Sequence, residues 1–138
     1  MIDRQQLFAH YEAGIVAALD PALGDAQAAW SDPALFCVLR HEACAVLTAW
    51  NPGFEQLSDS VNQERNTRLR TRVVLSGLEY WESLNSAPDG TFIEPGYLVW
   101  GISQERACEL AAAFAQFAIY WYDETGERSV IACDYAVE

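Results

Sequence analysis

Residues 43–52 (ACAVLTAWNP) and residues 59–76 (DSVNQERNTRLRTRVVLS) decide the fold class. The first stretch is a dense apolar run that ends abruptly at Asn51 and Pro52, which is typical of a buried strand. The second stretch has several capping residues at its start and Gly77 after its end, which predicts a long helix. A buried strand that leads into a long helix indicates a chain of mixed α and β structure.

The chain after this helix continues with two strands, a second helix and a hairpin. Strands are predicted over residues 78–84 and 97–102, a helix over 103–115, and the two strands of the hairpin over 117–122 and 129–133. From residue 43 to residue 122 the order is β-α-β-β-α-β, which is the ferredoxin-like order. We therefore predict an α+β fold, with two helices on one face of an antiparallel or mixed sheet and extra strands at its edges.

The chain before residue 43 is expected to add a helix and a strand. Apolar residues recur at every fourth position from 7 to 19, which predicts an amphipathic N-terminal helix over residues 4–19. An irregular connection is expected over residues 22–33. A strand over residues 35–39 is expected to pair with the strand over 43–50 through a turn at residues 40–42. Because no repeat or long linker interrupts the chain, residues 1–138 are predicted to form one domain.

The composition excludes several classes of protein. Hydrophobic residues make up 51% of the chain, which is too many for a disordered protein, yet no apolar run is as long as a membrane span. The start of the chain lacks the pattern of a secretory signal, so we expect a cytoplasmic protein. A net charge of −12 repels nucleic acids and anionic membranes. The acidity is explained by solubility or, alternatively, by docking to a basic partner as a DNA mimic does.

The long helix carries polar residues where apolar ones are expected. Helical periodicity places Asn62 and Asn66 on the same face as the apolar residues Leu69 and Val73. One interpretation is structural: the two amides bind backbone groups of the loop at residues 51–52, while Glu64 of the helix pairs with its Arg68. The other interpretation is an anion site formed by the helix N-terminus, the amides and the neighbouring arginines.

Glu94 is the carboxylate with the most informative position, since it precedes Pro95 at the entrance to an apolar strand. It is expected either to face Arg65 across a cleft or to pair with it and hold the strand to the helix. No residue is assigned a catalytic role, and no cofactor or metal is predicted. The residues assigned to a ligand site for a small anion or nucleotide are Asn51, Asn62, Arg65, Asn66, Arg72, Glu94 and Gln116.

The four cysteines have apolar neighbours, as expected of buried thiols. Cys37, His41 and Cys44 together form an alternative, because they offer three zinc ligands within eight residues. If residues 40–41 form a hairpin turn, Cys37 and Cys44 lie opposite each other on the two strands, which is core geometry as readily as a metal site.

Aromatic side chains gather on the predicted strands. Alternation along residues 117–122 places Trp121 on one face of the sheet, and Tyr120 and Tyr122 on the other. A sheet that helices cover on one face only would expose tyrosine and tryptophan on its open face. We therefore expect a homodimer through this face. Stacking on nucleic-acid bases is disfavoured by the net charge.

Several short motifs together resemble one bacterial family, the domain-of-unknown-function family 3293. The resemblance covers residues 43–122. The family pattern ends Glu-Pro-Ser with a serine where this chain has Gly96, and it has a glycine within Phe-Gly-Gln where this chain has Ala115. No serine nucleophile is therefore available at position 96. The motifs that carry the resemblance are Thr48-Ala49-Trp50-Asn51-Pro52, Asn62, Glu94-Pro95, Gly101-Ile102-Ser103 and Phe114-Ala115-Gln116.

The resemblance implies no activity, substrate or cofactor, so function is argued from the residues alone. We predict a non-enzymatic binding or protein-interaction module. The alternative is a small-anion or nucleotide-binding protein, or an enzyme, that uses Asn51, Asn62, Arg65 and Glu94. A weaker alternative is an acidic DNA mimic that binds a basic protein.

Overall fold

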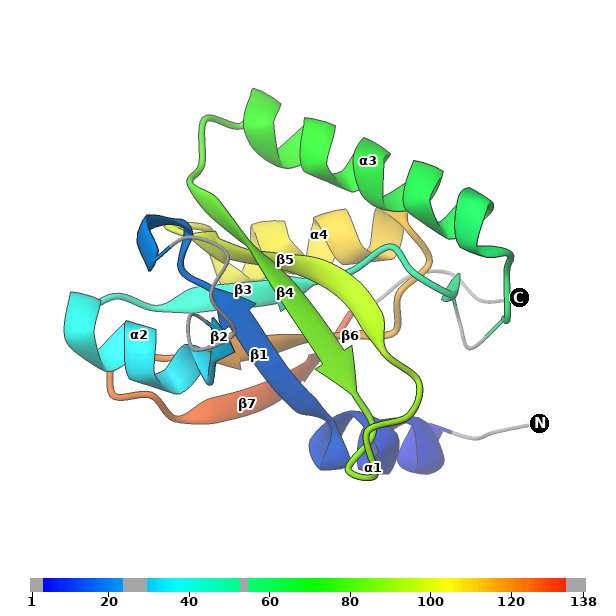
Figure 1. The fold of residues 1–138 in the computed structure, drawn as a ribbon, viewed down its shortest axis with the longest axis horizontal. Coiled ribbons are helices and arrows are strands. Elements are labelled where there is room, and N and C mark those ends of the chain that lie inside the picture. Colours follow the sequence, from blue (N-terminus) through cyan, green and yellow to red (C-terminus); the bar gives the residue numbers. More distant parts are fainter. Residues whose placement is uncertain (1–3, 24–29, 53–54, 134–138) are drawn as a thin grey trace.

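The computed structural model describes residues 4–23, 30–52 and 55–133, which form an α+β fold (Figure 1). Its helices are α1 (Arg4–Ala13), α2 (Pro33–Arg40), α3 (Asp59–Leu75) and α4 (Gln104–Ala113), with a 3-10 turn, η1, at Pro21–Leu23. Its strands are β1 (Ile15–Leu19), β2 (Trp30–Ser31), β3 (Cys44–Leu47), β4 (Tyr80–Ser86), β5 (Glu94–Trp100), β6 (Ala118–Tyr122) and β7 (Arg128–Ala132).

The seven strands form one antiparallel sheet in the order β2-β1-β4-β5-β3-β6-β7, which curls into a half-barrel. The structure thus confirms the α+β class and the antiparallel sheet. It does not show a ferredoxin-like fold, because β1 and β2 add two strands that were not predicted, and α1 and α2 pack on the face that was expected to be open. Strand β7 is the edge strand predicted over residues 129–133. None of the helices in the described ranges is both long and apolar enough to cross a bilayer.

Helices α3 and α4 pack on the outer face of the curl (Figure 1). Leu69 and Val73 of α3 and Leu110 of α4 are fully buried against β3, β5 and β6. Helix α3 begins where the sequence predicts, since the Ser58 Oγ accepts a hydrogen bond from the Val61 amide. Ser103 caps α4 in the same way, also as predicted.

The predicted helix over residues 4–19 is wrong beyond Ala13. Gly14 ends α1, and the next five residues form β1, which pairs with β4 from Ile15↔Ser86 to Ala18↔Ser83. The four-residue spacing was misleading because Ile15 and Leu19 belong to a strand, and the side chain of Leu7 lies outside the described part. Residues 24–29 of the expected connection also lie outside it.

The predicted strand over residues 35–39 is also wrong, because these residues lie in α2. Asp32 is the N-cap, accepting a hydrogen bond from the Ala34 amide at 2.9 Å, and Pro33 occupies the first helical turn. Phe36 and Cys37 face the core while Leu39 is exposed, so apolar residues on two sides of the helix hide its periodicity. Residues 40–42 therefore end a helix and do not form a hairpin turn.

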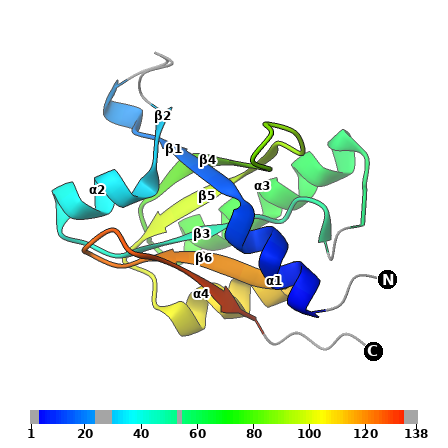
Figure 2. The ribbon, with the colours of Figure 1, turned by 90° about the horizontal axis from the view of Figure 1, so that it is seen from below.

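Helices α1 and α2 cover the inner face of the curl, at opposite ends of it (Figure 2). The expected open aromatic face is thereby closed: Trp81, Trp100, Tyr120 and Tyr122 are 7%, 2%, 5% and 2% exposed. Arg40 of α2 lies over the Trp100 ring, 4.1 Å from its centroid. These aromatic side chains stabilise the chain's own core, and a dimer through them would require α2 to move away.

Cys37 and Cys44 do lie against each other, but from α2 and β3 rather than from a hairpin. Their Sγ atoms are 3.5 Å apart, and both residues are fully buried and free of disulfides. His41 is exposed in the left-handed conformation that ends α2. Among the described residues, no group of three metal-binding side chains comes together, so the zinc alternative gains no support.

Candidate functional site

The two asparagines of α3 bind the loop that follows β3. The Asn66 Oδ1 accepts a hydrogen bond from the Ala49 amide, and its Nδ2 donates to the Pro95 carbonyl, both at 2.8 Å. The Asn62 Oδ1 accepts from the Asn51 amide, and its Nδ2 donates to the Asn51 Oδ1, again both at 2.8 Å. Asn62 therefore binds the loop at Asn51, as the structural interpretation expects, whereas Asn66 binds Ala49 and Pro95, outside residues 51–52.

The arginines of α3 do not converge on a ligand site. Arg65 Nε donates to the Ala49 carbonyl at 2.8 Å, and its Nη2 donates to the Phe114 carbonyl. Burial, and to a lesser extent Arg68, lowers the pKa of Arg65. Arg68 forms the expected ion pair with Glu64 at 2.8 Å, and Arg72 is exposed on the helix. Arg65 thus binds backbone carbonyls, and Arg68 and Arg72 lie on the helix surface.

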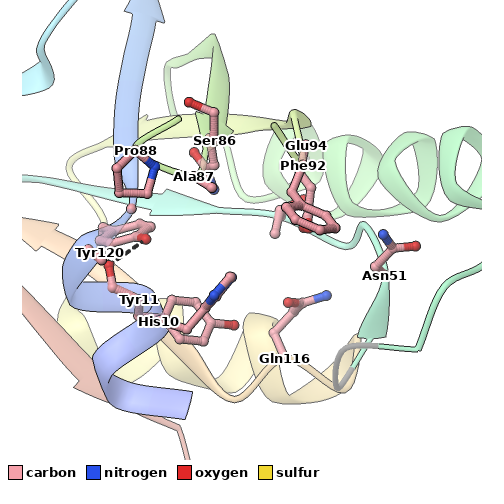
Figure 3. A pocket seen from close by; sticks show the side chains of 14 residues that line it. His10, Tyr11, Asn51, Ser86, Ala87, Pro88, Phe92, Glu94, Gln116 and Tyr120 are labelled. Atoms are coloured by element: carbon pink, nitrogen blue, oxygen red, sulfur yellow. Dashed lines mark hydrogen bonds between the residues drawn. The ribbon is translucent and has the colours of Figure 1, made fainter. Parts of the chain in front are cut away.

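Three of the predicted site residues do come together, around a cavity of about 80 Å³. Asn51 lies in the loop after β3, Glu94 opens β5, and Gln116 follows α4. Figure 3 shows Asn51 and Gln116 on one side of the pocket and Tyr11 and Tyr120 on the other. Asn62, Arg65 and Asn66 lie behind this wall and hold its backbone in place.

Glu94 is the central ionisable group of the cavity. It does not pair with Arg65, as was expected; no described side chain forms an ion pair or a hydrogen bond with its carboxyl group. Burial raises the pKa of Glu94 to about 7, because the charged form loses hydration that nothing replaces. At neutral pH the carboxyl group is therefore close to half ionised, which is a property typical of functional sites.

Helix α1 supplies the wall that the sequence did not reveal. His10 and Tyr11 line the cavity, and the Tyr11 carbonyl accepts a hydrogen bond from the Tyr120 hydroxyl at 2.7 Å. A Cβ atom at Gly14 would collide with that hydroxyl, so glycine is needed where α1 meets β1. Gly14 followed by β-branched residues marks the end of the helix, although it does not reveal what the helix packs against.

Residues of the β4–β5 connection form the mouth of the cavity (Figure 3). Phe92 is 65% exposed and has a φ of 55°, a conformation that is strained for a bulky side chain. Asn85 lies opposite Glu94 in the β4–β5 register, and its Oδ1 is buried without a hydrogen-bond partner among the described residues. A strained aromatic residue and an unpaired acceptor at one cavity are features that packing alone does not explain.

The side chains that line the cavity are those of a binding site, and the charge of this site changes when Glu94 gains or loses its proton. It offers a carboxyl group, an imidazole, hydroxyl groups, side-chain amides and aromatic rings, and no arginine. Nothing in this lining resembles the arginine-rich surroundings of a phosphate. The arrangement can hold a small polar molecule and exchange a proton with it through Glu94.

The comparison with known proteins identifies a family but no activity. The matching family model, described as a protein of unknown function (DUF3293), covers residues 47–119, more than half of the 138 residues. This range includes Asn51, Glu94 and Gln116 and excludes α1. No curated protein and no solved structure matches the chain. The resemblance seen in the motifs is confirmed, and the chain belongs to the DUF3293 family, whose function is unknown.

Proposed function

We propose that this protein is a small-molecule-binding module whose ligand enters the cavity between α1 and the β4–β5 connection. The observation that carries the proposal is the carboxyl group of Glu94, which is largely buried in this cavity with no ion pair or hydrogen bond from a described residue. Leaving a carboxyl group in such a place destabilises the fold unless something outside the chain uses it.

The surrounding structure supports the same proposal. Three hydrogen bonds with Asn62 and Asn66 hold the loop that carries Asn51, and a fourth joins Asn66 to Pro95 of β5, so this wall of the cavity is fixed before a ligand arrives. In this proposal the ferredoxin-like unit expected over residues 43–122 is the scaffold, and α1 with Gly14 closes the cavity. The ligand proposed here is a molecule that suits a carboxyl group, and it takes the place of the small anion considered from the sequence.

An experiment can distinguish this proposal from a protein-interaction or DNA-mimic function, since these two functions would use the acidic outer surface and not the cavity. The test is a thermal-shift screen of small polar compounds against the wild type, Ala13→Leu and Ala9→Leu. Both alanines are exposed on α1, but only Ala13 lines the cavity. Compounds that stabilise the wild type and Ala9→Leu, and fail to stabilise Ala13→Leu, are the expected result. Stabilisation that Ala13→Leu leaves unchanged would place the ligand elsewhere and overturn the proposal.

A further inference from the structure

The charges around the cavity select the class of ligand. Glu94 is the ionisable acid in the lining. Arg65 and Arg128, of which the second contacts the lining residues Gly14 and Tyr120, each donate hydrogen bonds to two backbone carbonyls. The chain as a whole carries a net charge of −12, which adds a long-range field of the same sign. The ionised Glu94 carboxylate and the net charge of the chain both repel an anionic ligand and attract a cation.

The hydrogen-bonding groups of the lining that have no partner also favour a cation. The Gln116 Nε2 donates to the Trp50 carbonyl at 3.1 Å, which leaves its Oε1 as an acceptor. The Asn85 Oδ1 is likewise an acceptor without a partner in the described part of the chain. Asn51 is the exception, because its Oδ1 accepts hydrogen bonds from Leu57 and Asn62 and only its N–H groups remain. Together with the Glu94 carboxylate, the Gln116 and Asn85 oxygens are three acceptors, and a ligand that donates several hydrogen bonds satisfies them.

Aromatic rings complete the lining. Tyr11, Tyr120 and Phe92 come from three different elements and surround the same space (Figure 3). The faces of such rings attract cations, most strongly where water is displaced. The volume, about 80 Å³, is well below the roughly 150 Å³ of an engineered cavity that holds benzene, so it suits a head group and not a large molecule.

Building on the function proposed above, we propose that the ligand is a protonated organic amine that places its ammonium group against Glu94, with its hydrocarbon part against Tyr11, Tyr120 and Phe92. An ammonium group has three N–H donors and no acceptor. It therefore matches a carboxylate, a glutamine Oε1 and an asparagine Oδ1 together.

The affinity for such an amine depends on pH through Glu94. Burial raises the pKa of this carboxyl group to about 7, so it is mostly protonated at about pH 6 and mostly ionised at about pH 8. The other titratable side chains that line the cavity are His10, Tyr11 and Tyr120. Because the ammonium group binds the ionised carboxylate, the affinity is expected to rise about ten-fold from pH 6 to pH 8.

The experiment compares butylammonium, butyramide and butyrate, which share a chain length and differ in charge. Each is titrated into the full chain while the backbone amide resonances are followed by NMR. The variants are Glu94→Gln and, as a matched control, Glu82→Gln, which changes an exposed carboxyl group on β4. Butylammonium is expected to shift the amides that line the cavity, with at least a ten-fold weaker affinity in Glu94→Gln and an unchanged affinity in Glu82→Gln.

The other outcomes separate this inference from the proposed function. If butyramide or butyrate binds the cavity at least as tightly as butylammonium, and Ala13→Leu abolishes that binding, the cavity is a ligand site but the amine inference is wrong. If butylammonium binds Glu94→Gln as tightly as the wild type, or does not bind at all, the inference is also wrong. The amide spectrum of Glu94→Gln shows directly whether that variant is folded.

Discussion

Glu94 couples the stability of the fold to pH in an unusual direction. Its pKa rises from the ordinary value of 4.5 to about 7 on folding, because burial removes hydration from the charged form. The folded state therefore holds the proton more tightly than the unfolded state between these values. At low pH Glu94 is protonated in both states and does not change the free energy of unfolding. Its ionisation then destabilises the fold progressively as the pH rises from 4.5 to about 7.

Glu94→Gln is expected to remove this dependence, since glutamine resembles the protonated acid. The variant and the wild type should be equally stable near pH 4, and the variant should be more stable by about 3 kcal/mol near pH 8. Urea denaturation at a series of pH values measures the difference. Glu82→Gln is the control, and a constant difference at every pH would contradict the assignment.

Ala115 lies in the left-handed region, with a φ of 57°, just after α4. The hydrogen bond from the Gln116 amide to the Ala111 carbonyl at 2.9 Å fixes this helix end. Glycine adopts such a conformation without the steric cost that a Cβ atom carries, so Ala115→Gly is expected to stabilise the protein by about 1 kcal/mol. The matched change Ala112→Gly, inside α4, should destabilise it by about 1 kcal/mol. Thermal unfolding tests both, and destabilisation by both would contradict this account.

At the residue scale the sequence identified three of the residues that line the cavity, Asn51, Glu94 and Gln116. Glu94 was found from its place at the entrance to an apolar strand, and Asn51 and Gln116 belong to the motifs that resemble the family. His10 and Tyr11 were missed because their helix was extended through a strand, which hid the turn that places them beside Tyr120. Their role depends on the approach of α1 to β6, a contact between residues more than a hundred positions apart, which no local pattern reveals.

Helix α3 and the loop after β3 act as one element. Asn66 bridges the Ala49 amide and the Pro95 carbonyl, so it joins the helix to the ends of two neighbouring strands. This is why β3 is shorter than the predicted strand: residues 48–50 leave the ladder and bind side chains. The sequence predicted that the amides on the apolar helix face need buried partners, but it placed those partners at residues 51–52 and did not identify Ala49 or Pro95.

Asn66→Ala is expected to destabilise the protein by about 2 kcal/mol, because it leaves the buried Ala49 amide without its acceptor. Arg72→Ala, an exposed change on the same helix, should alter the stability by less than about 0.5 kcal/mol. Chemical denaturation measures both variants. Equal effects would mean that the bridge adds nothing beyond helix propensity.

The element most at odds with its sequence pattern is α2. Asp32 and Pro33 form a standard helix start, but the apolar run that follows resembles a buried strand. The pattern was ambiguous because α2 has apolar residues on both its buried and its exposed side. Only the tertiary structure, in which α2 closes the inner face of the curl, distinguishes the two.

At the scale of the whole molecule, Arg128 connects the far ends of the curled sheet. Its Nη1 donates to the Gly14 carbonyl at 2.7 Å, and its Nη2 donates to the Glu12 carbonyl at 2.6 Å. It also lies 5.0 Å from the centroid of the Tyr120 ring. Strand β7 thereby holds the end of α1, and so one wall of the cavity, in position. The sequence predicted the strands after residue 43 but not β1, β2 or the curl, which brings distant segments together.

Arg128→Met keeps most of the side-chain length and removes both hydrogen bonds. Amide hydrogen exchange at the end of α1 and the start of β1 is expected to accelerate about ten-fold, since these segments lose two charge-assisted bonds. The amides of α3 and α4 should be unaffected. Arg106→Met, a change on the outer face of the sheet, is the control. Uniform acceleration across the sheet would show a global loss of stability instead.

The most direct test of the ligand site is the pKa of Glu94, measured by NMR of its side-chain carboxyl carbon without and with saturating butylammonium. The free protein should give a pKa near 7. The amine should lower it, because a bound cation favours the ionised carboxylate. A pKa near 4.5 that does not change on addition of the amine would contradict both the buried carboxyl group and the ligand that we assign to it.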